Sequence, residues 1–101
     1  MNIYYTTDEK YMKAVRKICW SEFSKAKLLL ENILEDEPDY GKAHCQLACI
    51  YYYELREYEK AKKHFELAIA FAPDFPDTYM DYLNLLVNTE DYEAAEKLAK
   101  K

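Results

Sequence analysis

Apolar positions along the chain recur with the spacing of one face of a helix. Tyr11, Ala14, Val15 and Ile18 stand at positions i, i+3, i+4 and i+7, which is the spacing of an amphipathic helix. The same spacing returns twice, at His44, Leu47, Ala48 and Tyr51 and then at Tyr79, Tyr82, Leu83 and Leu86. Together with the breaks between apolar runs, the pattern predicts helices over residues 7–19, 22–36, 40–54, 57–71, 76–88 and 91–101.

A second pattern stands at the start of every second predicted helix and shows that the sequence contains an internal repeat. An acidic and an aromatic residue are followed by an alanine, and these alanines, Ala26, Ala61 and Ala95, lie 35 and 34 residues apart. Pro38 and Pro73 follow the second helix of the first two units, where proline cannot continue a helix. A period of this length is typical of helical-repeat proteins. We therefore predict one domain of three units, at about 7–38, 39–73 and 74–101.

The repeat resembles the tetratricopeptide repeat, whose two helices carry an aromatic residue, Leu-Gly, Tyr, Ala-x-x-x-Phe and Pro in that order. Two departures concern packing. Val15, Ala48 and Leu83 stand where the family usually has glycine, and the connection between paired helices is one residue short from Ile18 to Ala26 and one residue long from Tyr51 to Ala61. The resemblance implies an all-α fold, a right-handed α-solenoid of about three antiparallel helix pairs. The middle unit matches best, at Leu47, Ala48, Tyr51, Ala61, Phe65, Ala68 and Pro73.

Composition excludes several classes of function. Gly41 is the lone glycine, so the glycine-rich loops that cradle phosphates are absent. The net charge of −5 disfavours nucleic acid as a partner, and no apolar run approaches the length of a membrane span. Three cysteines make an odd number, and Cys45 and Cys49 are spaced poorly for a disulfide. These features favour a protein of the reducing cytoplasm that contacts neither nucleic acid nor membrane.

The resemblance implies a binding surface, because in the family the first helix of each pair lines a concave groove for a peptide or a partner helix. One subtype of the family grips a C-terminal carboxylate with basic and amide side chains, but here Asp77 and Asp81 stand at two of those places and would repel it. A ligand of mixed charge is expected instead, because the groove runs from Arg16 and its basic neighbours to these acids. The groove residues would be Met12, Arg16, Cys19, Cys45, Cys49, Tyr52, Met80, Asn84 and Val87.

The sequence gives little support for catalysis or for metal binding. His44, Cys45 and Cys49 could ligate a metal, but His44 is predicted to point away from the cysteines, and a fourth ligand would have to be His64 on the other helix of the pair. The two histidines fit no nucleophile–base pattern. We therefore predict no enzyme activity, no cofactor and no metal site.

Self-association is the alternative to peptide binding. The third unit has no following repeat to cover apolar residues such as Leu85, Leu86 and Leu98. An uncovered patch of this kind often marks an association surface. The sequence thus also fits a scaffold repeat that forms a homodimer through its C-terminal unit, or a fragment of a longer repeat protein.

Overall fold

The computed structural model describes residues 6–100, and within this range the chain forms helices and no strand. The predicted all-α fold is confirmed, and the predicted helix limits agree with the structure to within two residues; residue 101 lies outside the described range. A short π-helical segment, η1 (Ile50–Glu54), continues the third helix. The α-helices are α1 (Thr7–Cys19), α2 (Phe23–Asp36), α3 (Gly41–Cys49), α4 (Tyr58–Phe71), α5 (Pro76–Asn88) and α6 (Tyr92–Ala99).

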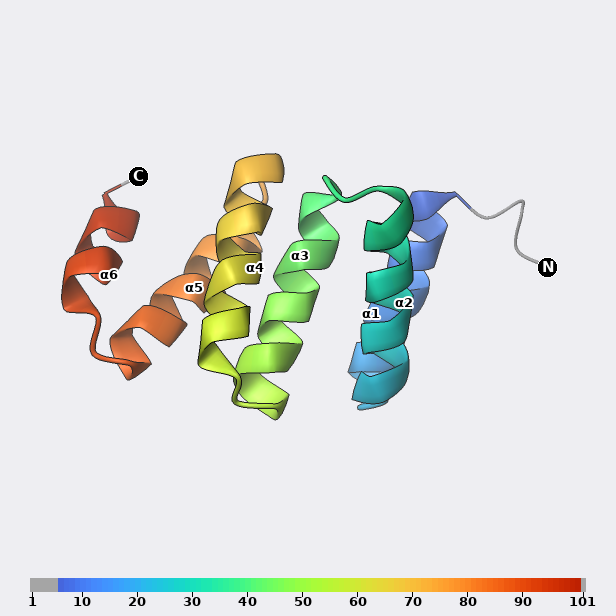
Figure 1. The fold of residues 1–101 in the computed structure, drawn as a ribbon, viewed down its shortest axis with the longest axis horizontal. Helices are drawn as coiled ribbons and strands as arrows, with labels where there is room; N and C mark the ends of the chain where they lie inside the picture. The colour runs from blue at the N-terminus through green and yellow to red at the C-terminus, as the bar shows by residue number, and fades with distance from the viewer. Residues whose placement is uncertain (1–5, 101) are drawn as a thin grey trace.

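The helices are arranged as three antiparallel pairs that follow one another in chain order (Figure 1). The molecule is elongated, with extents of 47 × 24 × 19 Å, and the α1–α2 pair and α6 lie at opposite ends. Fully buried side chains such as Leu30, Phe65 and Leu85 come from different pairs. The core therefore runs along the whole molecule, as expected where each repeat buries its apolar face against its neighbours.

The turn inside each pair has the same construction. Ser21, Arg56 and Glu90 adopt left-handed backbone conformations, with φ of 61°, 55° and 61°. An acidic residue follows each of them, and its carbonyl accepts a 3.0 Å hydrogen bond from the amide of the repeat alanine, which begins the second helix. Each left-handed residue stands five positions before that alanine. The unequal connection lengths seen in the sequence therefore arise before the turn, at the end of the first helix.

The π-helical segment η1 absorbs the extra residue of the second unit. In the first and third turns the amides of Glu22 and Asp91 donate to carbonyls five residues back, at 2.8 Å each. The equivalent amide of Glu57 donates to the carbonyl of Tyr51, six residues back, at 2.8 Å. A π-helical turn accommodates one additional residue without ending the helix. The insertion thus leaves the turn and the second helix unchanged.

The third unit covers its own apolar residues, so the expectation that Leu85, Leu86 and Leu98 lack a cover is wrong. Leu85 and Leu86 are each 2% exposed and Leu98 is 9% exposed. The reason is that α5 packs against α4 on one side and α6 on the other. At this end the exposed apolar side chains are instead Met80, Val87 and Tyr92.

Candidate functional site

The first helices of the three pairs are joined by hydrogen bonds between their side chains. Gln46 of α3 donates to the hydroxyl of Tyr11 of α1 at 3.1 Å. The hydroxyl of Tyr53 donates to Oδ1 of Asp81 of α5 at 2.9 Å. These hydrogen bonds link α1, the continuous helix of α3 and η1, and α5. We call the surface that these three helices form the first-helix face. Its residues are Met12, Arg16, Gln46, Cys49, Tyr53, Asp81, Asn84 and Asn88.

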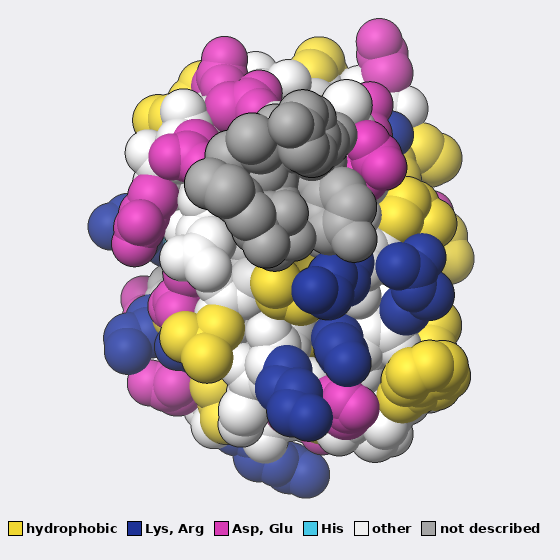
Figure 2. All heavy atoms as spheres, turned by 90° about the vertical axis from the view of Figure 1, so that its right-hand side faces the viewer, with side chains coloured by type: hydrophobic (Ala, Val, Ile, Leu, Met, Phe, Trp, Pro, Cys, Tyr) yellow, Lys and Arg dark blue, Asp and Glu magenta, His cyan; other side chains and the backbone are white. Residues whose placement is uncertain are grey.

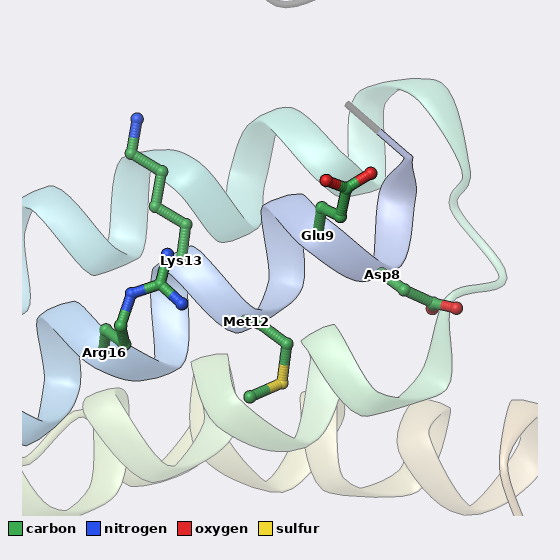
Figure 3. A pocket seen from close by; sticks show the side chains of 5 residues that line it. All are labelled: Asp8, Glu9, Met12, Lys13 and Arg16. Atoms are coloured by element: carbon green, nitrogen blue, oxygen red, sulfur yellow. The ribbon is translucent and has the colours of Figure 1, made fainter. Parts of the chain in front are cut away.

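The N-terminal part of this face is hollowed. A depression of about 410 Å³ is lined by five residues of α1: Asp8, Glu9, Met12, Lys13 and Arg16. Figure 3 shows Met12 extending from α1 toward α3, with the carboxylates of Asp8 and Glu9 nearer the start of the helix. A capping box fixes that start, because the side chain of Thr6 accepts from the amide of Glu9 and the carboxylate of Glu9 accepts from the amide of Thr6. The hollow thus combines an apolar thioether with both signs of charge.

Basic residues gather at the same end of the molecule. Helix α1 carries Lys10, Lys13, Arg16 and Lys17, and Figure 2, which views this end, shows Lys and Arg side chains side by side on the surface. At the other end of the first-helix face, α5 contributes Asp77 and Asp81. Helix α1 thus carries these basic residues and helix α5 these acids, while Asp8 and Glu9 add negative charge within the α1 hollow.

The predicted groove residues differ in how far their side chains are exposed to solvent. Arg16, Cys19 and Asn84 are exposed, Met12, Met80 and Val87 are 50%, 75% and 46% exposed, and Cys49 is half-buried. Cys45 is fully buried, and Tyr52 is 5% exposed. These two side chains lie beneath the surface and support it from below.

Sequence reasoning missed Tyr53 and Asn88. Tyr53 is 46% exposed, whereas Ile50, Tyr51 and Tyr52 before it are all buried. Because a π-helical segment has more residues per turn than an α-helix, positions counted at α-helical spacing are shifted once η1 begins. The extra residue between Tyr51 and Ala61 was the only signal in the sequence that could have revealed this shift.

The polar side chains of Tyr52, Asn84 and Asn88 form a small network. The hydroxyl of Tyr52 donates to Oδ1 of Asn84 at 2.5 Å, and the Asn88 amide donates to that hydroxyl and, at 3.1 Å, to Oδ1 of Asn84. Asn84 and Asn88 are both exposed. Their amides can therefore meet a backbone or side-chain group of a ligand while Tyr52 holds them in place.

The two histidines pair with each other. Nδ1 of His44 and Nδ1 of His64 are 3.0 Å apart, and the rings stack with centroids 5.2 Å apart. Nε2 of His44 donates to the carbonyl of Pro38 at 2.8 Å, so its Nδ1 accepts from Nδ1–H of His64. Burial, with the nearby His44 and Lys63, lowers the pKa of His64 to about 4. As predicted, His44 is buried and directed away from the cysteines.

Among the described residues, one group can hold a metal ion. A ligand atom from each of Cys45, Cys49 and Asp81 lies within 4.8 Å of the other two. Asp81 lies 32 residues beyond Cys49 and was not among the sequence-based candidates.

Comparisons with known proteins find similarity both to a family model and to a curated protein. Residues 41–75 match the family model described as tetratricopeptide repeat. The chain is also similar to cell division cycle protein 27 homolog A of Arabidopsis thaliana, with 30% identity over 91 residues. That alignment covers 88% of this chain and 13% of the relative, so the chain spans a small part of the relative's length. Every helix in the part of the chain that the structure describes is too short or too polar to cross a membrane.

Proposed function

Since the chain belongs to the tetratricopeptide-repeat family, we propose that it is a non-catalytic protein-interaction module whose first-helix face forms a concave groove for an extended peptide or a partner helix. Stacked helical repeats create extended concave surfaces that proteins of this architecture use for binding. The observation that carries the proposal is the continuity of this face, in which hydrogen bonds join α1 to α3 and η1 to α5. A ligand lying across α1, α3 and α5 would contact a surface whose helices are held in fixed positions relative to one another.

The chemistry of the face indicates the kind of peptide. Met12 is exposed at one end of this face, and methionine side chains adapt their shape to varied apolar partners. Lys13 and Arg16 lie on α1, while Asp77 and Asp81 lie on α5. A peptide with an acidic residue toward α1, a basic residue toward α5 and apolar side chains between them fits both features.

Selection of peptides from a random display library tests this function. Peptides that bind should lose affinity about ten-fold or more for an Arg16→Glu variant, because the reversed charge repels the acidic end of the ligand. Lys63→Glu makes the same charge change at an exposed position of α4, away from the face, and should leave binding unchanged. Selected peptides that bind wild type and the Arg16→Glu variant equally would place the binding site elsewhere.

Self-association is the second candidate, and a specific hollow supports it. Residues of α5 and α6 together with Pro73 enclose a depression of about 370 Å³. Sedimentation velocity over a concentration series tests this candidate. Ala99→Glu would place a charge at the hollow from an exposed position, so it should suppress a dimer formed there and leave peptide binding intact. The lining residues are Pro73, Tyr79, Met80, Leu83, Leu98 and Ala99.

The odd number of cysteines further supports a reducing compartment, and we place the module in the cytoplasm.

A further inference from the structure

Two cysteines of α3 and one carboxylate of α5 meet on the inner side of the first-helix face. Cys45 and Cys49 are one helical turn apart, and Sγ of Cys49 donates to Oδ2 of Asp81 at 3.3 Å. The three ligand atoms all lie within 4.8 Å of one another. Around a tetrahedral zinc ion, with Zn–S of about 2.3 Å and Zn–O of about 2.0–2.2 Å, such atoms stand about 3.6–3.8 Å apart. The 3.3 Å between Sγ of Cys49 and Oδ2 of Asp81 is already close to this spacing, and the other separations need to shorten by at most about an ångström.

The surroundings of the three ligands resemble those of a supported metal site. The hydroxyl of Tyr53 donates to Oδ1 of Asp81 at 2.9 Å and leaves Oδ2 directed at the cysteines. Hydrogen bonds of this kind orient carboxylate ligands in metal centres. Thr78 is fully buried near Cys45, and its hydroxyl has no hydrogen-bond partner among the described residues. A Cys45 thiolate would be a charged acceptor for this otherwise orphaned donor.

Metal binding requires the two cysteines as thiolates, so it releases protons. A bound cation would take the place of the protons of Cys45 and Cys49, and both protons leave to solvent as the two metal–sulfur bonds form. Two thiolates and one carboxylate then face a divalent charge, and no electron is transferred.

We propose that Cys45, Cys49 and Asp81 bind one zinc ion. The donor set of two sulfurs and one oxygen suits zinc, and three protein ligands leave the fourth position to water or to a group of a bound partner. Cys49 and Asp81 are half-buried, whereas Cys45 is fully buried. The ion would therefore reach the site from the first-helix face, past Cys49 and Asp81. The site differs from the metal cluster considered from the sequence. His44 and His64 hydrogen-bond to each other, and Asp81 supplies the third ligand.

Zinc at this position would join α3 to α5. Its ligands lie next to Tyr53, whose hydroxyl already joins η1 to α5. The ion would therefore hold the second helix pair against the third at the centre of the first-helix face. The proposal does not depend on peptide binding, and the two are tested by different measurements.

Titration of the reduced protein with Zn²⁺, and with Cd²⁺ for its thiolate charge-transfer absorption, tests the site. We expect one ion per chain, a higher melting temperature with zinc, and protection of Cys45 and Cys49 from alkylation while the exposed Cys19 still reacts. Cys49→Ser should abolish the charge-transfer band that two thiolates give. Asp81→Asn, which keeps the size of a half-buried side chain, should weaken zinc binding about ten-fold or more.

Two control variants make the test specific. Asp74→Asn makes the same change at an exposed position outside the cluster and should bind zinc as wild type does. His64→Gln should also retain zinc, and loss of zinc binding in that variant would move the site to the histidine pair. Circular dichroism checks that each variant is folded, and if Cys49→Ser is not, Asp81→Asn decides. Equal zinc affinity in wild type and in a folded Asp81→Asn variant would overturn the proposal, as would failure of the reduced wild-type protein to retain one equivalent.

Discussion

The hydroxyl of Tyr52 donates a 2.5 Å hydrogen bond to Oδ1 of Asn84, and this bond joins the end of the third helix to the middle of α5. Tyr52 is almost completely buried and its ring lies 4.4 Å from that of Tyr53 and 5.8 Å from that of Tyr58. The side chain therefore contributes to the stability of the repeat stack as well as to the first-helix face.

A double-mutant cycle on this pair measures the link between the second and third repeats. Tyr52→Phe should lower the free energy of unfolding by about 1 kcal/mol, because it removes the hydrogen bond and keeps the ring. Asn84→Ala should cost a similar amount, and the double variant should cost less than the sum of the two. Urea unfolding of the four proteins provides the values. Strictly additive effects would mean that the bond contributes nothing to stability.

Gly41→Ala is expected to destabilise the protein although alanine favours helices. A Cβ atom at Gly41 would lie 2.5 Å from Cβ of Ala72, 2.8 Å from its backbone nitrogen and 3.1 Å from the backbone carbon of Phe71. Backbone atoms cannot rotate aside, so α3 must shift from the end of α4, at about 1–3 kcal/mol. The gain in helix propensity is at most about 1 kcal/mol. Thermal unfolding measures the balance, and an unchanged or higher melting temperature would show that α3 moves freely.

The repeat period and the helices could be predicted from the sequence because they follow from local patterns. The apolar face of each helix and the alanines Ala26, Ala61 and Ala95 identify the contacts within a pair, and all three alanines are buried. Burial of Leu86 was not predicted, because it depends on how closely α6 folds back over α5. The prediction considered only a following repeat as a cover, whereas α6 (Tyr92–Ala99) packs on α5 and Leu86 is buried.

The candidate site was less predictable, since its residues meet across repeats. Asp81 reaches Cys49 and Tyr53 only because α5 packs beside α3 and η1. Tyr53 lies at the surface in place of Tyr52 because η1 is π-helical. Counting residues at α-helical spacing does not predict this shift. Side chains brought together from different repeats leave no local pattern, so only the three-dimensional arrangement reveals them.

Ala61→Leu tests the contact between the paired helices. Ala61 is fully buried at the start of α4, and added methylene groups there would overpack the core by roughly 1–3 kcal/mol. Ala70→Leu on the same helix provides the matched control, because Ala70 is exposed and the added side chain meets solvent. Chemical denaturation of both variants gives the comparison. Equal stability of the two would contradict the assignment of Ala61 to the helix–helix contact.

The stability of the fold should fall as the pH drops from about 6.5 to about 4. Burial, with His44 and Lys63, lowers the pKa of His64 to about 4 in the folded protein, whereas a histidine in an unfolded chain titrates near 6.5. Between these values the unfolded chain binds a proton that the folded chain does not, so the contribution of His64 is complete above pH 6.5 and is lost toward pH 4. The ordinary pKa of carboxyl groups lies near the lower end of this window, so wild type must be compared with a variant that lacks the titrating ring. His64→Gln removes the titrating ring and keeps an amide N–H that can donate to Nδ1 of His44. Urea unfolding of wild type and variant at several pH values between 7.5 and 4.5 should therefore give a steeper decline for wild type, and parallel declines would mean that His64 takes up its proton equally well in both states.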